Sequence, residues 1–135
     1  MSTTDLITIL PLLILAGGIV LIMLLLTVIR SHALTMVLAV LTLVIAIAAM
    51  PVSPSIHLRN VTPLLVFDNY AMIYMIMIFG AALVTCILSY GYMQCRQNIK
   101  EEFYLILLTA ALGCGVIVAS SHFVSFFLGL EILSV

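Results

Sequence analysis

Residues 6–29 read LITILPLLILAGGIVLIMLLLTVI, an uninterrupted run without a charged side chain. At about 1.5 Å of rise per residue, such a run is long enough as a helix to cross the roughly 30 Å hydrocarbon core of a bilayer. Residues 33–50 and 69–93 repeat the pattern, and residues 103–119 do so at the lower limit of length. These runs predict an all-α fold, a polytopic bundle of membrane helices.

The composition points the same way. Of the 135 residues, 66% are hydrophobic and 7% are charged, whereas a soluble domain carries about 25% charged residues. The mean hydropathy is +1.45. The sequence has no basic cluster of the kind that binds nucleic acid, so we expect a lipid bilayer as its surroundings and no nucleic-acid partner.

A fifth apolar stretch, residues 122–135, follows a polar turn and runs to the last residue. As a helix it spans only about 21 Å, less than the bilayer core requires. We therefore expect four complete transmembrane helices and a truncated fifth, with 1–135 forming the N-terminal portion of a larger protein or one half of a split one. The first helix is expected to be retained, because Asp5 stands where a secretory signal has a basic residue.

The connectors between these runs set an orientation. The first and third connectors carry Arg30, Arg96 and Lys100, the second carries Arg59, and the fourth carries no lysine or arginine. The positive-inside rule therefore puts the first and third connectors in the cytoplasm and the N-terminus on the periplasmic side. The proline-rich second connector, residues 50–68, is predicted to be an extended surface loop rather than another helix.

Glu131 is the strongest candidate for chemistry, because it is a lone carboxylate in an apolar run. A helix that starts near His122 carries Glu131 about 15 Å into the membrane, half the thickness of the core. Carboxylates at such depth are costly and commonly serve proton or ion pathways. Loss of hydration favours the protonated carboxyl and a nearby cation favours the charged one, so alternation between these conditions loads and releases a proton. The alternative is a neutral glutamate that hydrogen-bonds to a neighbouring helix and has only a structural role.

A cationic partner for Glu131 is not expected within this sequence. Lys100, the only lysine, belongs to a connector on the opposite side of the membrane. The partner must therefore come from further sequence or from another subunit. His122 lies about half a turn out of phase and is expected at the outer interface, while Phe127 and Ser134 share the helix face of Glu131.

The other polar features have structural explanations. Glu101 and Glu102 open a helix, where acidic side chains complement the helix dipole. Asp68 is expected at the N-cap or in the first turn of the third helix. The methionines Met72, Met75 and Met77 lack the Cys or His partners of a soft-metal site, so apolar packing is expected.

The cysteines and several small residues are predicted to pack between helices. Cys86, Cys95 and Cys114 have no metal-binding or CxxC spacing, so we expect them to behave as small hydrophobes. Small residues favour close contact between membrane helices. The candidates for such contacts are Gly17, Gly18, Gly80, Ala81, Ala82, Ala110, Ala111, Gly113 and Gly115.

The second half of the chain resembles subunit N of the bacterial proton-pumping NADH-quinone oxidoreductase, respiratory complex I, a subunit with an antiporter-like fold. The motifs are Glu101-Glu102-Phe-Tyr-Leu-Ile-Leu-Leu-Thr-Ala-Ala-Leu-Gly113 and Phe126-Phe-Leu-Gly-Leu-Glu131-Ile-Leu-Ser134. Two further stretches are similar, Val66-Phe67-Asp68-Asn-Tyr-Ala and Leu88-Ser89-Tyr90-Gly91-Tyr92. The resemblance covers roughly residues 60–135 well, and the first two helices only in layout.

The resemblance implies that Glu131 corresponds to the fifth-helix glutamate of the family, which pairs with a lysine two helices later. It implies proton translocation coupled to quinone reduction, in a bacterial inner membrane, with other membrane subunits of complex I as partners. This chain is expected to bind no cofactor itself, because quinone, NADH, FMN and iron–sulfur clusters would belong elsewhere in the complex. The family's channel lysines are absent from this sequence.

Two alternatives stay open at this stage. In the first, the helices form a structural or assembly module without transport, and Glu131 is a neutral packing residue. In the second, the chain belongs to a sister cation/proton antiporter or to a membrane-bound hydrogenase.

Overall fold

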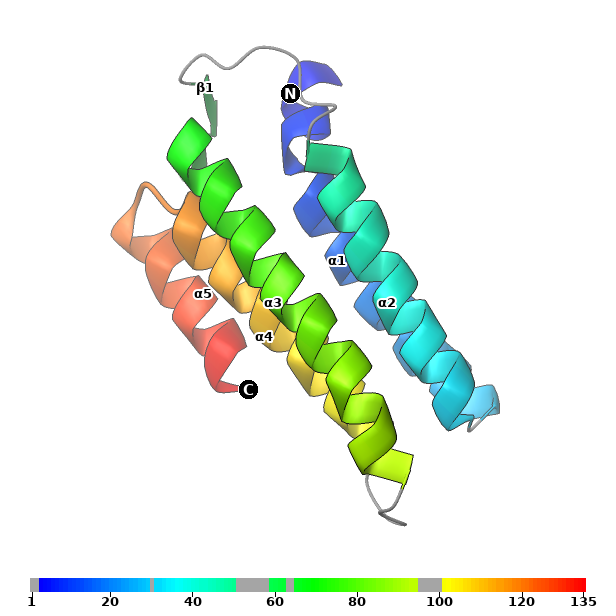
Figure 1. Ribbon diagram of the computed structural model, residues 1–135. Helices are drawn as coiled ribbons and strands as arrows, with labels where there is room; N and C mark the ends of the chain where they lie inside the picture. Colours follow the sequence, from blue (N-terminus) through cyan, green and yellow to red (C-terminus); the bar gives the residue numbers. More distant parts are fainter. Residues whose placement is uncertain (1–2, 30, 51–58, 63–64, 95–100) are drawn as a thin grey trace.

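The computed structural model describes residues 3–29, 31–50, 59–62, 65–94 and 101–135. Within these residues the helices are α1 (Thr3–Val28), α2 (His32–Ala49), α3 (Asn69–Gln94), α4 (Glu102–Ala119) and α5 (Phe123–Ser134). The long helices lie side by side, with α1 next to α2, and α5 lies against α4 (Figure 1). The predicted all-α bundle of four long helices and a shorter fifth is confirmed.

Four of these helices are long and apolar enough to cross a bilayer, so the chain is an integral membrane protein. α1 and α3 have 26 residues each, α2 and α4 have 18 each, and α5 has 12. At 1.5 Å of rise per residue these lengths correspond to about 39, 27 and 18 Å. Only 22% to 33% of each spanning segment is buried inside the bundle, which leaves wide apolar faces for lipid.

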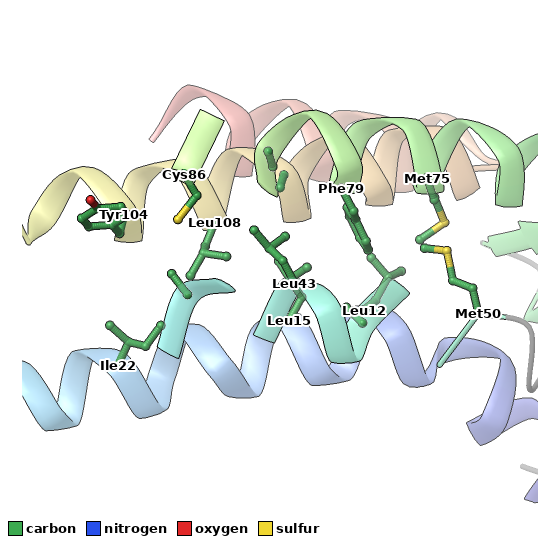
Figure 2. Close-up of a cluster of buried hydrophobic side chains, with 14 of the residues drawn as sticks. Leu12, Leu15, Ile22, Leu43, Met50, Met75, Phe79, Cys86, Tyr104 and Leu108 are labelled. Atoms are coloured by element: carbon green, nitrogen blue, oxygen red, sulfur yellow. The ribbon is translucent and has the colours of Figure 1, made fainter. Parts of the chain in front are cut away.

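The core is a row of apolar side chains that recur every three or four residues along the helices. This spacing puts them on one face of each helix, turned toward the neighbouring helices. Figure 2 labels ten of them, from Met50 and Met75 at one end to Tyr104 at the other. The buried apolar residues are Leu12, Leu15, Ile22, Ala39, Leu43, Ala46, Met50, Ala71, Met75, Phe79, Ala82, Cys86, Tyr104, Leu108, Ala111 and Ala119.

Threonine hydroxyls inside the spans bond to the backbone of their own helix. The Thr35 hydroxyl donates to the Ser31 carbonyl at 3.0 Å, and the Thr109 hydroxyl donates to the Leu105 carbonyl at 2.7 Å. The Thr42 hydroxyl reaches both the Leu38 and the Ala39 carbonyl oxygens, at 2.9 and 2.8 Å. Because lipid offers no hydrogen bonds, such local pairing lets polar side chains remain in membrane helices.

The described parts of the second connector form a short antiparallel hairpin, with β1 (Arg59–Thr62) paired to β2 (Leu65–Phe67). Leu65 also forms a bridge with Ser120, so the hairpin is tied to the turn between α4 and α5. The connector prolines Pro51, Pro54 and Pro63 lie outside the described residues.

The basic residues behind the predicted orientation also lie outside the described part of the chain. These are Arg30, Arg96 and Lys100, and Cys95 lies in the same undescribed stretch as the last two. Of the other two cysteines, Cys86 is buried and Cys114 is half-buried, and both are free thiols. They are packed within the bundle as small side chains.

Candidate functional site

The helix that carries Glu131 starts at the end of the bundle where the hairpin lies (Figure 1). His122 is its N-cap residue, with φ −122° and ψ 148°. The His122 carbonyl oxygen accepts hydrogen bonds from the Phe126 N–H at 3.1 Å and from the Ser125 hydroxyl at 2.9 Å. The His122 side chain is exposed. These bonds fix the first turn of α5 and therefore the direction in which the helix leaves this end.

α5 meets α4 at close range, through backbone atoms and the side chain of Ile117. The buried residues of α5 are Ser125 and Gly129. A Cβ added to Gly113 would lie 2.9 Å from the Leu133 nitrogen and 3.1 Å from the Gly129 carbonyl oxygen. A Cβ added to Gly129 would lie 2.6 Å from the Ile117 Cγ1, 3.1 Å from the Ile117 nitrogen and 3.2 Å from the Gly113 oxygen. We call this contact the glycine seam: Gly113 and Ile117 of α4 against Gly129 and Leu133 of α5.

Only part of the glycine seam was expected from the sequence. Gly113 was a candidate for a close helix contact, but Gly129 was not. The signal that was available is the Ser125-Phe-Phe-Leu-Gly129 spacing, which puts two small residues one turn apart on the same helix face. Because small-xxx-small spacing is frequent in membrane helices, the pattern alone did not identify the partner helix.

Glu131 lies on the face of α5 that is turned away from the bundle. Its side chain is exposed, and so are those of Phe127 and Ser134. The Ser134 hydroxyl donates to the backbone carbonyl of Glu131 at 3.2 Å rather than to its carboxylate. Along α5, Glu131 is about 12 Å beyond Phe123. Because Ser125 and Gly129 face α4, the Glu131 carboxylate points outward.

This placement limits what the carboxylate can do. Among the described residues no basic side chain forms an ion pair with Glu131. The outer face of α5 leaves the carboxylate open to lipid or to a further helix that packs there.

The methionines of α3 differ in burial. Met75 is buried and faces Met50 in the core (Figure 2). Met72 is half-buried and Met77 is exposed. Among the described residues no group of three or more His, Cys, Asp or Glu side chains is placed to hold a metal ion. Met75 packs in the core as an apolar side chain.

The acidic residues near helix starts take the places expected of them. Asp68 immediately precedes α3, and its carbonyl oxygen accepts a hydrogen bond from the Met72 N–H at 3.0 Å. Glu101 is the N-cap residue of α4, and Glu102 lies in its first turn. Both positions of α4 are ones where a negative charge meets the positive end of the helix dipole.

No model of a known protein family matches this chain. The functional interpretation therefore rests on the residues and on their geometry, above all on the exposed carboxylate of α5.

Proposed function

We propose that this chain is a membrane subunit of a proton-translocating NADH-quinone oxidoreductase, of the subunit N type, in which Glu131 is a residue of the proton channel. The observation that supports this proposal is an exposed carboxylate on the outer face of the apolar helix α5. The motif around it, Gly129-Leu-Glu131-Ile-Leu-Ser134, is the one that resembles subunit N. A carboxyl group in this position changes its proton affinity when a cation approaches or withdraws.

In this proposal the cation comes from a helix that packs on the outer face of α5. When its charge is close, Glu131 is held as the carboxylate, and when it withdraws, Glu131 takes up a proton. Alternation between the two conditions moves a proton one step across the membrane without any redox group on this chain. Quinone, NADH, FMN and iron–sulfur clusters belong to other parts of the complex, and other membrane subunits of complex I are the partners.

We also propose the location that goes with this function, a bacterial inner membrane with the N-terminus on the periplasmic side. Three of the four basic residues belong to the first and third connectors, which favours the cytoplasm for those connectors. α5 then enters from the periplasmic side, and Glu131 is reached from that side through the first two turns of α5.

The test is Glu131→Gln in the assembled complex in its own membrane vesicles. Glutamine keeps the size and polarity of the side chain but cannot carry a proton. We expect proton translocation per electron to fall to a small fraction of the wild-type value. Leu130→Gln is the matched control, because Leu130 is an exposed neighbour on the same helix. This control introduces the same amide without removing the carboxylate, so pumping should persist.

Unchanged pumping in Glu131→Gln, in complexes that reduce quinone at the normal rate, would remove Glu131 from the channel. One observation favours a second candidate, a structural module: the carboxyl is on the outside of the described bundle, where a neighbouring subunit or helix would meet it. In that case Glu131→Gln reduces the amount of assembled complex on native gels, while each assembled complex pumps normally. A sister antiporter or hydrogenase subunit would instead show the pumping defect in membranes without NADH-quinone oxidoreductase activity.

A further inference from the structure

A cluster of polar aromatic side chains lies at the end of the bundle where α2 and α4 begin and α3 ends. His32 is the first residue of α2, Tyr90 is in the last turns of α3, and Tyr104 is in the first turn of α4. The His32 ring is stacked on Tyr90, with ring centroids 5.2 Å apart and planes 9° apart. It also meets the Tyr104 ring at 5.6 Å and 40°. Three helices therefore bring their rings together around one imidazole.

The hydrogen-bonding atoms of this cluster are buried without protein partners. Tyr104 has 0% of its surface exposed and forms one end of the buried row in Figure 2. The Tyr104 hydroxyl and both ring nitrogens of His32 are buried, and none of the three has a hydrogen-bond partner in the described part of the chain. A neutral imidazole needs one donor and one acceptor, and a phenol hydroxyl can serve as either. Buried polar groups of this kind are almost always paired with protein or with ordered water.

We propose that His32 and Tyr104 form a buried site for an ordered water molecule. Water has the chemistry that this site requires, because it is small, donates to a ring nitrogen and accepts from the phenol hydroxyl.

The site is independent of the proposed function. It lies at the opposite end of the bundle from the start of α5, and a bundle that transports no protons would still bind water here.

The experiment uses the intact chain in lipid nanodiscs, with histidine rings labelled with ¹⁵N and observed by solid-state NMR. The sequence has three histidines, His32, His57 and His122, so the signals lost in His32→Gln identify His32. We expect magnetisation transfer from water to the His32 ring nitrogens.

Tyr104→Phe keeps the ring and removes only the hydroxyl that would hold the water. We expect it to shift both His32 nitrogen signals and to remove most of the water transfer to them. Tyr74→Phe is the matched control, because Tyr74 is exposed on α3 and the same hydroxyl is removed away from the site. Unchanged His122 signals establish that each variant is folded.

Two results would overturn the proposal. One is the absence of water transfer to His32 in the wild-type chain, which needs no variant at all. The other is a folded Tyr104→Phe chain whose His32 signals match those of the wild type.

Discussion

The helix pairs α1–α2 and α4–α5 both meet at a glycine, but different atoms face the glycine in the two pairs. The three atoms nearest to a Cβ added to Gly18 of α1 all belong to the Thr42 side chain: Cγ2, which is the closest, Cβ at 3.0 Å and Oγ1 at 3.5 Å. The three atoms nearest to a Cβ added to Gly113 of α4 are backbone atoms of α5. A shorter side chain opposite Gly18 would remove the closest contact, whereas backbone moves only if the whole helix moves. The effect of replacing a glycine therefore depends on what lies opposite it.

The largest effect is expected for Gly113→Ala in the glycine seam. The added methyl would lie 2.9 Å from the Leu133 nitrogen and 3.2 Å from the Leu133 Cα, so α5 must move away from α4. Overpacking of this kind costs about 1–3 kcal/mol of unfolding free energy. The measurement is the free energy of unfolding of the chain in mixed detergent micelles.

A second readout ties the seam to the carboxylate. Because the seam sets the direction of Glu131, Gly113→Ala should also change the environment of the Glu131 carboxyl, visible as a shift of its ¹³C resonance. Full stability together with an unshifted carboxyl resonance would mean that the seam does not fix α5.

An intermediate effect is expected for Gly18→Ala. The atoms nearest to the new methyl belong to the Thr42 side chain, so we expect a cost in the lower part of the overpacking range of about 1–3 kcal/mol. Thr42→Ser removes the Thr42 methyl and keeps the hydroxyl that bonds to the Leu38 and Ala39 carbonyls. The double variant Gly18→Ala/Thr42→Ser should therefore recover part of the lost stability. A double-mutant cycle in the same micelles measures this coupling. Additive effects of the two substitutions would show that Thr42 is not what limits the space at Gly18.

The helices of this chain were predictable because each is a long apolar run between polar connectors. The 69–93 run corresponds to α3, Asn69–Gln94, and the 33–50 run to α2, His32–Ala49. Which face of each helix is buried was not predictable. In a soluble bundle the polar residues mark the outer face, but lipid requires an apolar outer face as well, so that signal is missing. Leu43 is buried and Val44 beside it is exposed, although both are apolar.

The same limitation applies to the candidate sites. The depth of Glu131 followed from its place in the run, whereas its outward direction depends on how Gly129 rests on α4. The apolar run at residues 33–50 leaves His32 in the first connector, and the sequence did not predict its contact with Tyr90 and Tyr104. The available signal was topological: in antiparallel helices joined by short turns, the start of α2, the end of α3 and the start of α4 come to the same end of the bundle. Whether rings at these helix ends stack depends on how each helix is rotated about its axis, and the sequence pattern does not predict that rotation.

The smallest effect, with the opposite sign, is expected for Gly17→Ala. Gly17 is the immediate neighbour of Gly18, yet a Cβ on Gly17 would have no atom within 4 Å. Alanine in a helix interior is favoured over glycine by about 0.5–1 kcal/mol, because glycine loses more backbone freedom on folding. Gly17→Ala should therefore leave the unfolding free energy unchanged or raise it slightly in the same micelle titration. A Cβ on Gly80 of α3 would also have no atom within 4 Å, so Gly80→Ala should change the unfolding free energy in the same way as Gly17→Ala. If Gly17→Ala were as costly as Gly18→Ala, the α1–α2 contact would have to be rotated about the helix axis, and the contrast with the glycine seam would lose its basis.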